Sequence, residues 1–142
     1  MTQKIVYSDG IFDLFHRGHV EYLKQCKNIF TNTYLIIGII NDIDSTNYKR
    51  TPIYSEDDRY EIIANSKYVD KIVKDAPLII TKDFLDLYKI DYVVHGYANS
   101  SDANNQDDFF KIPRELNKFI ETKYYDGISS TDIIKKIKLQ NN

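Results

Sequence analysis

The chain has 142 residues, which is the length of about one domain. Hydrophobic residues make up 42% and charged residues 28%, and this balance excludes a fully disordered chain, a collagen-like fibre and a coiled-coil rod. The formal net charge of -2 provides no global positive field, so no nucleic-acid partner is expected. Because Cys26 is the single cysteine, no disulfide can form within the chain, and a cytoplasmic location is predicted.

No apolar segment approaches the length needed to cross a bilayer, which is roughly 20 residues. The longest apolar run covers residues 34–40 and has the length of a strand. The N-terminus leads directly into Ile5, Val6 and Tyr7, without the apolar region of a signal peptide. We therefore expect neither a membrane-spanning segment nor a secretion signal.

Short apolar runs alternate with helix-length amphipathic segments along the chain. This alternation is typical of a parallel sheet flanked by helices, so we predict a single α/β domain. Ser55 is the expected N-cap of one helix, because the acidic residues 56–58 suit a helix start. The predicted strands are residues 5–7, 33–40, 69–73, 91–94 and 119–124, and the predicted helices are residues 19–30, 55–67, 81–89 and 130–139.

Several polar segments are expected to be irregular. Ser8, Asp9 and Gly10 are expected to end the first strand, and residues 41–53 to form a polar loop. Residues 99–108 form a low-complexity polar patch, for which we predict a mobile loop. Pro113 would interrupt a helix interior, so residues 109–118 are left without a predicted element.

The first candidate site lies between the first strand and the first helix. Ligands of parallel sheets bind beyond the C-terminal ends of strands, and Gly10 lets the backbone approach a ligand there. Gly18 keeps a side chain off the next helix start, whose free N–H groups favour phosphate. His16 and His19 are three residues apart and share a helical face. Two imidazoles at this place can donate hydrogen bonds to phosphate oxygens whose charge grows in a transition state.

Two other interpretations of the histidine pair are open. His16 and His19 could be half of a zinc site, for which His95 or Cys26 is a plausible third ligand. Alternatively, both could be ordinary solvated polar groups. The neighbouring glycines at a strand-to-helix turn favour the phosphate interpretation.

These residues also carry a resemblance to a known family. The motif His16-x-Gly18-His19 after a strand resembles the signature of the nucleotidyltransferase superfamily. The longer segment 7–19 is similar to phosphocholine and phosphoethanolamine cytidylyltransferases. The resemblance implies a Rossmann-like catalytic domain over residues 1–142, which transfers a cytidylyl group from CTP to a phosphoalcohol with Mg²⁺ as cofactor. It also implies a homodimer whose interface includes residues 67–73. No acidic cluster supplies a full metal cage, which suits Mg²⁺ held mostly by phosphates and water.

A second candidate site is the basic segment that follows the second strand. Mobile loop lysines near a phosphate site can follow charge as it moves between phosphates, although a solvated basic loop is an equal alternative. Tyr48-Lys49 and Arg59-Tyr60 match pairs of the family. The family lysine bridges nucleotide and substrate phosphates, which implies a catalytic role for Lys49 and a nucleotide contact for Arg59. An ion pair between Arg59 and helix acids is the alternative. Arg50 stands where the family usually has glycine.

A third candidate site combines His95-Gly96 at a strand end with the hydroxyl-rich helix start after Gly127. Exposed N–H groups and hydroxyls at a helix start form an anion cradle, and simple helix capping by Ser129 or Ser130 is the alternative. Tyr124 stands where the family usually has a phosphate-binding arginine, which leaves an inactive nucleotide-binding module as one reading. The nucleotide contacts that the resemblance implies are Gly10, Ile11, Phe12, Asp13, Gly18, Arg59, His95, Gly96, Gly127, Ile128, Ser129 and Ser130.

The choice of phosphoalcohol depends on a few positions. A choline head group needs an aromatic cage, whereas an ethanolamine ammonium needs oxygen acceptors. Leu78 stands where phosphocholine enzymes place a tryptophan, and His95-Gly96 is similar to the phosphoethanolamine branch. We therefore predict phosphoethanolamine, with Leu78, Tyr97 and Lys49 at the substrate. Phosphocholine, through a cage of tyrosines such as Tyr97, and glycerol-3-phosphate are alternatives. So is an adenylyltransferase, which residues 128–131 also resemble.

Overall fold

The computed structural model describes residues 2–97, 100–123, 125 and 127–140. Its strands are β1 (Lys4–Gly10), β2 (Thr33–Ile39), β3 (Lys71–Val73), β4 (Tyr92–His95) and β5 (Phe119–Glu121). They form one sheet in the order β3-β2-β1-β4-β5, and every pairing is parallel. The prediction of one α/β domain with a parallel sheet is confirmed. Since the chain proceeds from β1 to β2 on one side and later returns to β4 on the other, β1 and β4 flank the point where the strand order reverses.

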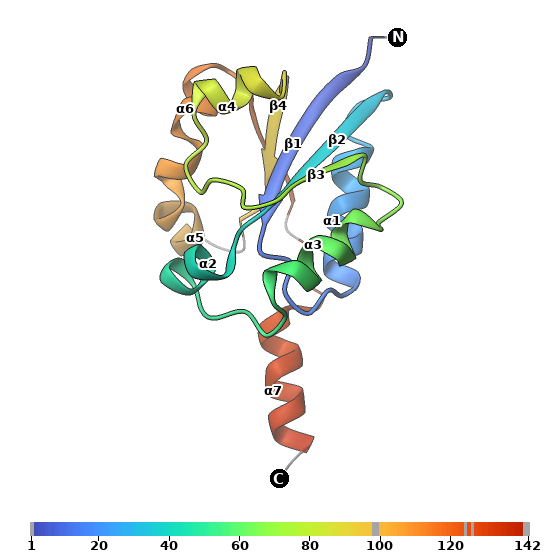
Figure 1. Ribbon diagram of the computed structural model, residues 1–142, viewed down its shortest axis with the longest axis vertical. Coiled ribbons are helices and arrows are strands. Elements are labelled where there is room, and N and C mark those ends of the chain that lie inside the picture. Colours follow the sequence, from blue (N-terminus) through green and yellow to red (C-terminus); the bar gives the residue numbers. More distant parts are fainter. Residues whose placement is uncertain (1, 98–99, 124, 126, 141–142) are drawn as a thin grey trace.

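Helices cover both faces of this sheet (Figure 1). On one side lie α1 and α3, and on the other lie α4 and α6, while α7 projects away from the body of the protein. The helices are α1 (Arg17–Lys27), α2 (Asp42–Tyr48), α3 (Glu56–Ala64), α4 (Lys82–Leu87), α5 (Ser100–Asn105), the 3-10 helix η1 (Asp107–Phe110), α6 (Lys111–Glu115) and α7 (Ser130–Gln140).

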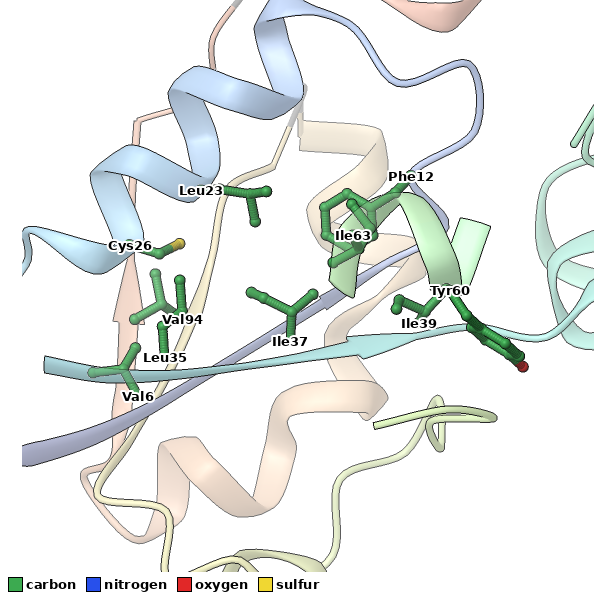
Figure 2. Packing of buried hydrophobic residues seen from close by; sticks show 10 residues of the cluster. All are labelled: Val6, Phe12, Leu23, Cys26, Leu35, Ile37, Ile39, Tyr60, Ile63 and Val94. Carbon is green, nitrogen blue, oxygen red and sulfur yellow. The ribbon is translucent and has the colours of Figure 1, made fainter. Parts of the chain in front are cut away.

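The core explains why β2 is apolar along its whole length. Leu35 and Ile37 pack into the cluster beneath α1 and α3, whereas Ile36 packs into the cluster on the opposite face. Figure 2 shows the first cluster, in which Leu23 and Ile63 lie over the strands. A strand buried on both faces needs apolar residues at successive positions.

Two segments that we predicted to be irregular are regular. Ser8, Asp9 and Gly10 belong to β1, and the first of them is fully buried, with its hydroxyl 2.6 Å from the Tyr22 hydroxyl. The predicted loop 41–53 contains α2, because the Asn41 side chain accepts a hydrogen bond from the Asp44 N–H and caps the helix.

The predicted mobile loop 99–108 is also wrong over its described part, residues 100–108, which begins with α5 and continues into η1. Residue 99 lies outside the described residues. Pro113 is accommodated as the third residue of α6, where its missing N–H needs no partner within the helix. Helix α1 begins at Arg17, two residues before the predicted start, and helix α3 begins after the predicted cap Ser55.

Candidate active site

A cavity of about 270 Å³ opens at the C-terminal ends of β1 and β4. This is the place at which ligands bind in parallel sheets whose strand order reverses. Its described wall comprises Asp9, Gly10, Ile11, Phe12, Asp13, His16, Gly18, His19, Tyr22, Tyr48, Lys49, Arg50, Pro52, His95, Gly96, Asp102, Gln106, Tyr125, Ile128, Ser129, Ser130 and Thr131. The structure therefore brings residues from all three candidate segments of the sequence to one cavity.

The two histidines form a fixed pair at the start of α1. His16 is the N-cap, and its Nδ1 accepts a hydrogen bond of 2.9 Å from the Gly18 N–H. The Nδ1 of His19 accepts a hydrogen bond of 3.2 Å from the His16 N–H. The ring centroids are 4.0 Å apart and the ring planes differ by 30°. Because each Nδ1 is an acceptor, each neutral ring carries its proton on Nε2, where it can donate to a ligand.

Burial keeps these rings neutral. Desolvation, and after it the interaction with His16, lowers the pKa of His19 to about 3. The pKa of His16 is also lowered, chiefly by desolvation. Both histidines are therefore neutral near pH 7 and offer a hydrogen-bond donor rather than a positive charge.

The turn between β1 and α1 depends on Gly18. A Cβ at this position would lie 2.7 Å from Cε1 of His16 and 3.1 Å from the Ile128 carbonyl oxygen. A side chain would thus separate the imidazole from the segment that leads into α7. Within this turn, Phe12 has a φ of 57°, and its ring centroid lies 5.6 Å from that of the His19 ring. The turn is packed from both sides, which positions the imidazoles.

The start of α7 closes one side of the cavity. The Ser129 hydroxyl accepts a hydrogen bond of 3.1 Å from the Asp132 N–H, and the Ser130 hydroxyl donates one of 2.7 Å to the Asp13 carbonyl. The alternative of helix capping is therefore confirmed for Ser129. The first N–H groups of a helix have no partner within it, so this start still offers N–H donors to an anion.

Lys49 and Arg50 follow α2 directly and line the same cavity. Lys49 is exposed, and its Nζ lies 5.7 Å from the centroid of the Tyr48 ring. A lysine on a flexible stem at this place can reach a phosphate in the cavity. Asp13 is hydrogen-bonded to the loop that carries Lys49.

Asp13 is an anchor for that loop. Its carboxylate accepts hydrogen bonds from the Ile53 N–H at 2.7 Å and the Tyr54 N–H at 2.9 Å, and it pairs with Nη1 of Arg50 at 3.2 Å. The side chain is 5% exposed. We predicted a nucleotide contact at Asp13. The structure places the residue on the cavity wall, but its carboxylate is hydrogen-bonded to the loop that follows α2. Its carbonyl accepts a hydrogen bond from the Ser130 hydroxyl.

A polar cluster from β1, β4 and the segment after α5 lines another part of the cavity. Nε2 of His95 lies 2.8 Å from Oε1 of Gln106, which is 4% exposed. Since an amide oxygen only accepts, His95 carries its proton on Nε2. Its Nδ1 is buried without a partner among the described residues and lies 3.9 Å from Oδ1 of Asp9. Two acceptors thus face each other across a short gap.

Burial shifts the titration of both groups in this cluster. Desolvation raises the pKa of Asp9 to about 7 and lowers the pKa of His95 to about 4. Near neutral pH, Asp9 is therefore partly protonated and His95 is neutral. A cation placed between them would favour the ionised form of Asp9.

With this geometry in view, comparison with known proteins places the sequence. The family model described as Cytidylyltransferase-like matches residues 7–136. The chain belongs to the cytidylyltransferase-like family. The resemblance that segment 7–19 predicted is confirmed, and the cavity lies where the motif of that segment meets α7.

Curated relatives extend this finding. Choline-phosphate cytidylyltransferase 2 of Arabidopsis thaliana is 45% identical over 135 residues, which are 93% of this chain and 44% of that protein. Ethanolamine-phosphate cytidylyltransferase of Dictyostelium discoideum is 38% identical over 139 residues, which are 96% of this chain and 38% of that protein. The chain thus spans less than half the length of these relatives.

A solved structure supports the same fold. The lipopolysaccharide core biosynthesis protein from Thermoplasma volcanium GSS1 superposes with a TM-score of 0.66 at 26% sequence identity. The superposition covers 87% of this chain and 98% of that one. The predicted Rossmann-like fold is confirmed.

Arg59, which matches an arginine of the family, is enclosed by the protein. Arg59 is 0% exposed and lies outside the described cavity wall. Its Nη1 donates to the carbonyls of Ile11 at 2.8 Å and Ile40 at 2.7 Å, its Nε to the carbonyl of Tyr54 at 3.2 Å, and its Nη2 to Oδ1 of Asp42 at 2.7 Å. These contacts join the turn after β1, the segment between β2 and α2, and the segment before α3. The geometry supports the alternative of an ion pair with a helix acid, Asp42, over a direct nucleotide contact.

Three other predicted site residues also lie outside the described wall of the cavity: Leu78, Tyr97 and Gly127. Leu78 is partly buried and packs against the core cluster on the second face of the sheet. The Tyr97 hydroxyl accepts a hydrogen bond of 2.8 Å from Nη2 of Arg114. A Cβ at Gly127 would lie 2.6 Å from the Tyr125 hydroxyl, so glycine permits this close approach. Tyr124 lies outside the described residues.

Asp9 and Gln106 are among the cavity residues that the sequence interpretation missed. Asp9 was expected to end a strand, and Gln106 lies within the predicted low-complexity loop. A carboxylate directly before Gly10 at a strand end was the available signal for the first, whereas no local signal marked the second. Within the described part of the chain, no three histidine, cysteine or acidic side chains are grouped to hold a metal ion, and Cys26 is fully buried in the core. No helix there is long and apolar enough to span a membrane.

Proposed function

We propose that this protein transfers the cytidylyl group of CTP to phosphoethanolamine and releases pyrophosphate, and that residues 1–142 form the catalytic domain. A phosphate oxygen of phosphoethanolamine attacks the α-phosphorus, and a new P–O bond forms as the bond to the β-phosphate oxygen breaks. The electron pair of that bond leaves with pyrophosphate. The observation that supports this proposal is the convergence of His16, His19, Lys49 and the α7 start on one cavity.

The proposed mechanism is positioning combined with charge stabilisation. Nε2–H groups of His16 and His19 donate to the α-phosphate oxygens, on which charge grows in the transition state. Lys49 contacts the phosphates of both reactants, and the N–H groups at the start of α7 hold the triphosphate. Transfer between phosphates needs no covalent intermediate on the protein if both reactants are held in line.

We also propose Mg²⁺ as the cofactor. The described residues offer no set of three metal ligands, which suits an ion held largely by phosphate oxygens and water. When bound, Mg²⁺ would neutralise part of the phosphate charge. The assignment is tested by the dependence of turnover on Mg²⁺ in the presence of CTP.

The polar cluster supports an alcohol that carries an ammonium group. Asp9 and Nδ1 of His95 are two buried acceptors 3.9 Å apart on the cavity wall. A primary ammonium has three N–H donors and can bond to both acceptors. Glycerol-3-phosphate has no cation to satisfy a buried carboxylate.

Phosphocholine is the second candidate substrate. Relatives named choline-phosphate cytidylyltransferase reach 45% and 43% identity, above the 38% and 33% of relatives named for ethanolamine-phosphate. Tyr22 and Tyr48 line the cavity, and aromatic side chains bind quaternary ammonium groups. The assay must therefore compare phosphoethanolamine with phosphocholine.

The decisive assay is pyrophosphate release from CTP and Mg²⁺ with each phosphoalcohol. We expect phosphoethanolamine to exceed phosphocholine and glycerol-3-phosphate in kcat/KM by about tenfold or more. A higher kcat/KM for phosphocholine would contradict phosphoethanolamine as the substrate and favour phosphocholine. Turnover with ATP instead of CTP would favour an adenylyltransferase, and CTP binding without turnover on any phosphoalcohol would favour an inactive module.

The raised pKa of Asp9 predicts a pH dependence of substrate binding. As the pH rises through the Asp9 pKa of about 7, the carboxyl ionises, so the KM for phosphoethanolamine should fall between about pH 6 and about pH 8. His95 stays neutral in this range, because its pKa is about 4. Asp9→Asn should raise this KM about tenfold. In this variant, the only pH dependence of the KM that remains should be the one caused by titration of the substrate phosphate. An unchanged pH profile in Asp9→Asn would contradict the assignment.

The homodimer and the cytoplasmic location are also proposals. The predicted interface stretch 67–73 ends in β3, which lies at an edge of the sheet. An edge strand with unpaired backbone groups is a surface to which a second copy can pair. Light scattering after size-exclusion chromatography measures the mass in solution, and a monomer at micromolar concentration would contradict the dimer.

A further inference from the structure

Arg50 differs from Arg59 in a way that points to a ligand. Arg59 is 0% exposed and uses four of its N–H groups in hydrogen bonds. Arg50 has a side chain that is 38% exposed, lies on the cavity wall and makes one contact, from Nη1 to Oδ2 of Asp13 at 3.2 Å. Its other guanidinium N–H groups have no partner among the residues that the structure describes.

The partner of Arg50 does not depend on it. Three backbone N–H groups also donate to the Asp13 carboxylate, from Leu14 at 3.1 Å, Ile53 at 2.7 Å and Tyr54 at 2.9 Å. The carboxylate therefore stays hydrogen-bonded when the guanidinium binds a second anion. Asp13 thus holds Arg50 beside the cavity without occupying its whole donor set.

Asp13 also defines the side of the cavity on which Arg50 lies. Its carbonyl accepts the hydrogen bond from the Ser130 hydroxyl at the first residue of α7. Arg50 and the N–H groups of the α7 start therefore neighbour the same residue, while Asp9 and His95 come from the strands β1 and β4. A guanidinium beside a helix N-terminus favours an anion with several oxygens.

We propose that Arg50 is a nucleotide-binding residue, whose guanidinium binds the β- and γ-phosphates of CTP and the pyrophosphate that leaves. This inference rests on the proposed function. As the bond between the α-phosphorus and the β-phosphate oxygen breaks, that oxygen keeps the electron pair and pyrophosphate gains charge. The planar fork of Arg50 can bind two of its oxygens, whereas Lys49 offers a point charge that both reactants share.

The test compares Arg50→Ala with the wild-type chain. We expect the KM for CTP and the inhibition constant of pyrophosphate each to rise about tenfold, because a charge-assisted bidentate contact is lost. The KM for the phosphoalcohol should change by less than about twofold, since that substrate binds elsewhere. Free guanidinium ion at millimolar concentration should restore part of the pyrophosphate affinity. Arg50→Lys should fall between the two, because it keeps the charge and loses the fork.

Arg17→Ala is the matched control. Arg17 has a side chain that is 76% exposed, pairs with Glu21 on α1 and lies outside the described cavity wall, so its loss removes the same charge without the contact. The proposal is overturned if Arg50→Ala leaves CTP and pyrophosphate binding unchanged, or if it weakens the phosphoalcohol alone.

Direct binding separates this proposal from the proposed function. The dissociation constants of CTP and pyrophosphate, measured by calorimetry on the wild-type chain and Arg50→Ala, require no turnover. CTP binding without turnover would contradict the proposed function, and the tenfold difference in affinity would still decide the role of Arg50. A wild-type chain that binds neither CTP nor pyrophosphate would overturn both.

Discussion

His19→Ala is expected to lower kcat for pyrophosphate release by a factor of about 10²–10³, the usual loss when one donor to a developing oxyanion is removed. The His19 ring has a pKa of about 3 and is neutral, and its Nδ1 is occupied by the His16 N–H. The Nε2–H is therefore the donor that we propose for the α-phosphate. Because that contact strengthens as charge grows, the loss should fall on kcat more than on the KM for CTP, measured by steady-state kinetics.

A second variant separates donation from positioning. His19→Asn offers a side-chain oxygen near the place of Nδ1, so the contact with the His16 N–H can persist while the Nε2 donor is lost. Both variants should lose a similar factor if donation matters. Near wild-type turnover in His19→Asn would refute the donor role. The double variant with His16→Ala should lose less than the product of the single losses if both rings donate to one phosphate, as we propose.

The fold was largely predictable because its signals are local. Strand β2 is apolar at successive positions since helices cover both faces, and this pattern is visible in the sequence alone. The acidic turn after Ser55 marked the start of α3. In contrast, α2 was missed because its residues are polar, and only the cap at Asn41 distinguishes it from a loop.

The candidate site was predictable where neighbours in sequence are neighbours in space. His16, Gly18 and His19 lie within one turn, and a motif can report such a cluster. Gln106 was missed, because its partner His95 is 11 residues away and the helical segment between them was taken for a loop. A pairing of this kind follows from tertiary packing and leaves no periodic pattern.

Arg59 shows the same limit in the opposite direction. A cation near a phosphate loop resembles a ligand contact in sequence, but the carbonyls of Ile11 and Ile40 that it binds are 48 and 19 residues away. Only the folded chain shows that this guanidinium is enclosed. Arg50, by contrast, departs from the family pattern, and its place on the cavity wall gives that departure a function to test.

Arg59→Leu is expected to lower the free energy of unfolding by about 3 kcal/mol or more, because several buried carbonyls lose their donor at once. The guanidinium is 0% exposed and makes four hydrogen bonds, so leucine would leave three carbonyls and the Asp42 carboxylate without this donor. Urea unfolding followed by circular dichroism measures the loss. Arg59→Lys should lose less, because an ammonium can satisfy some but not all of these acceptors.

Substitution of Arg59 should also lower catalytic activity, although Arg59 lies outside the described cavity wall. Arg59 joins the β1–α1 turn, through Ile11, to the loop that carries Lys49, through Tyr54 and Asp42. Loosening this joint separates the histidine side of the cavity from the lysine side, so kcat should fall in the fraction of Arg59→Lys that remains folded. The affinity for pyrophosphate should change less, because Arg50 stays anchored on Asp13. A stability loss below about 1 kcal/mol in Arg59→Leu would show that the buried clamp is dispensable for folding.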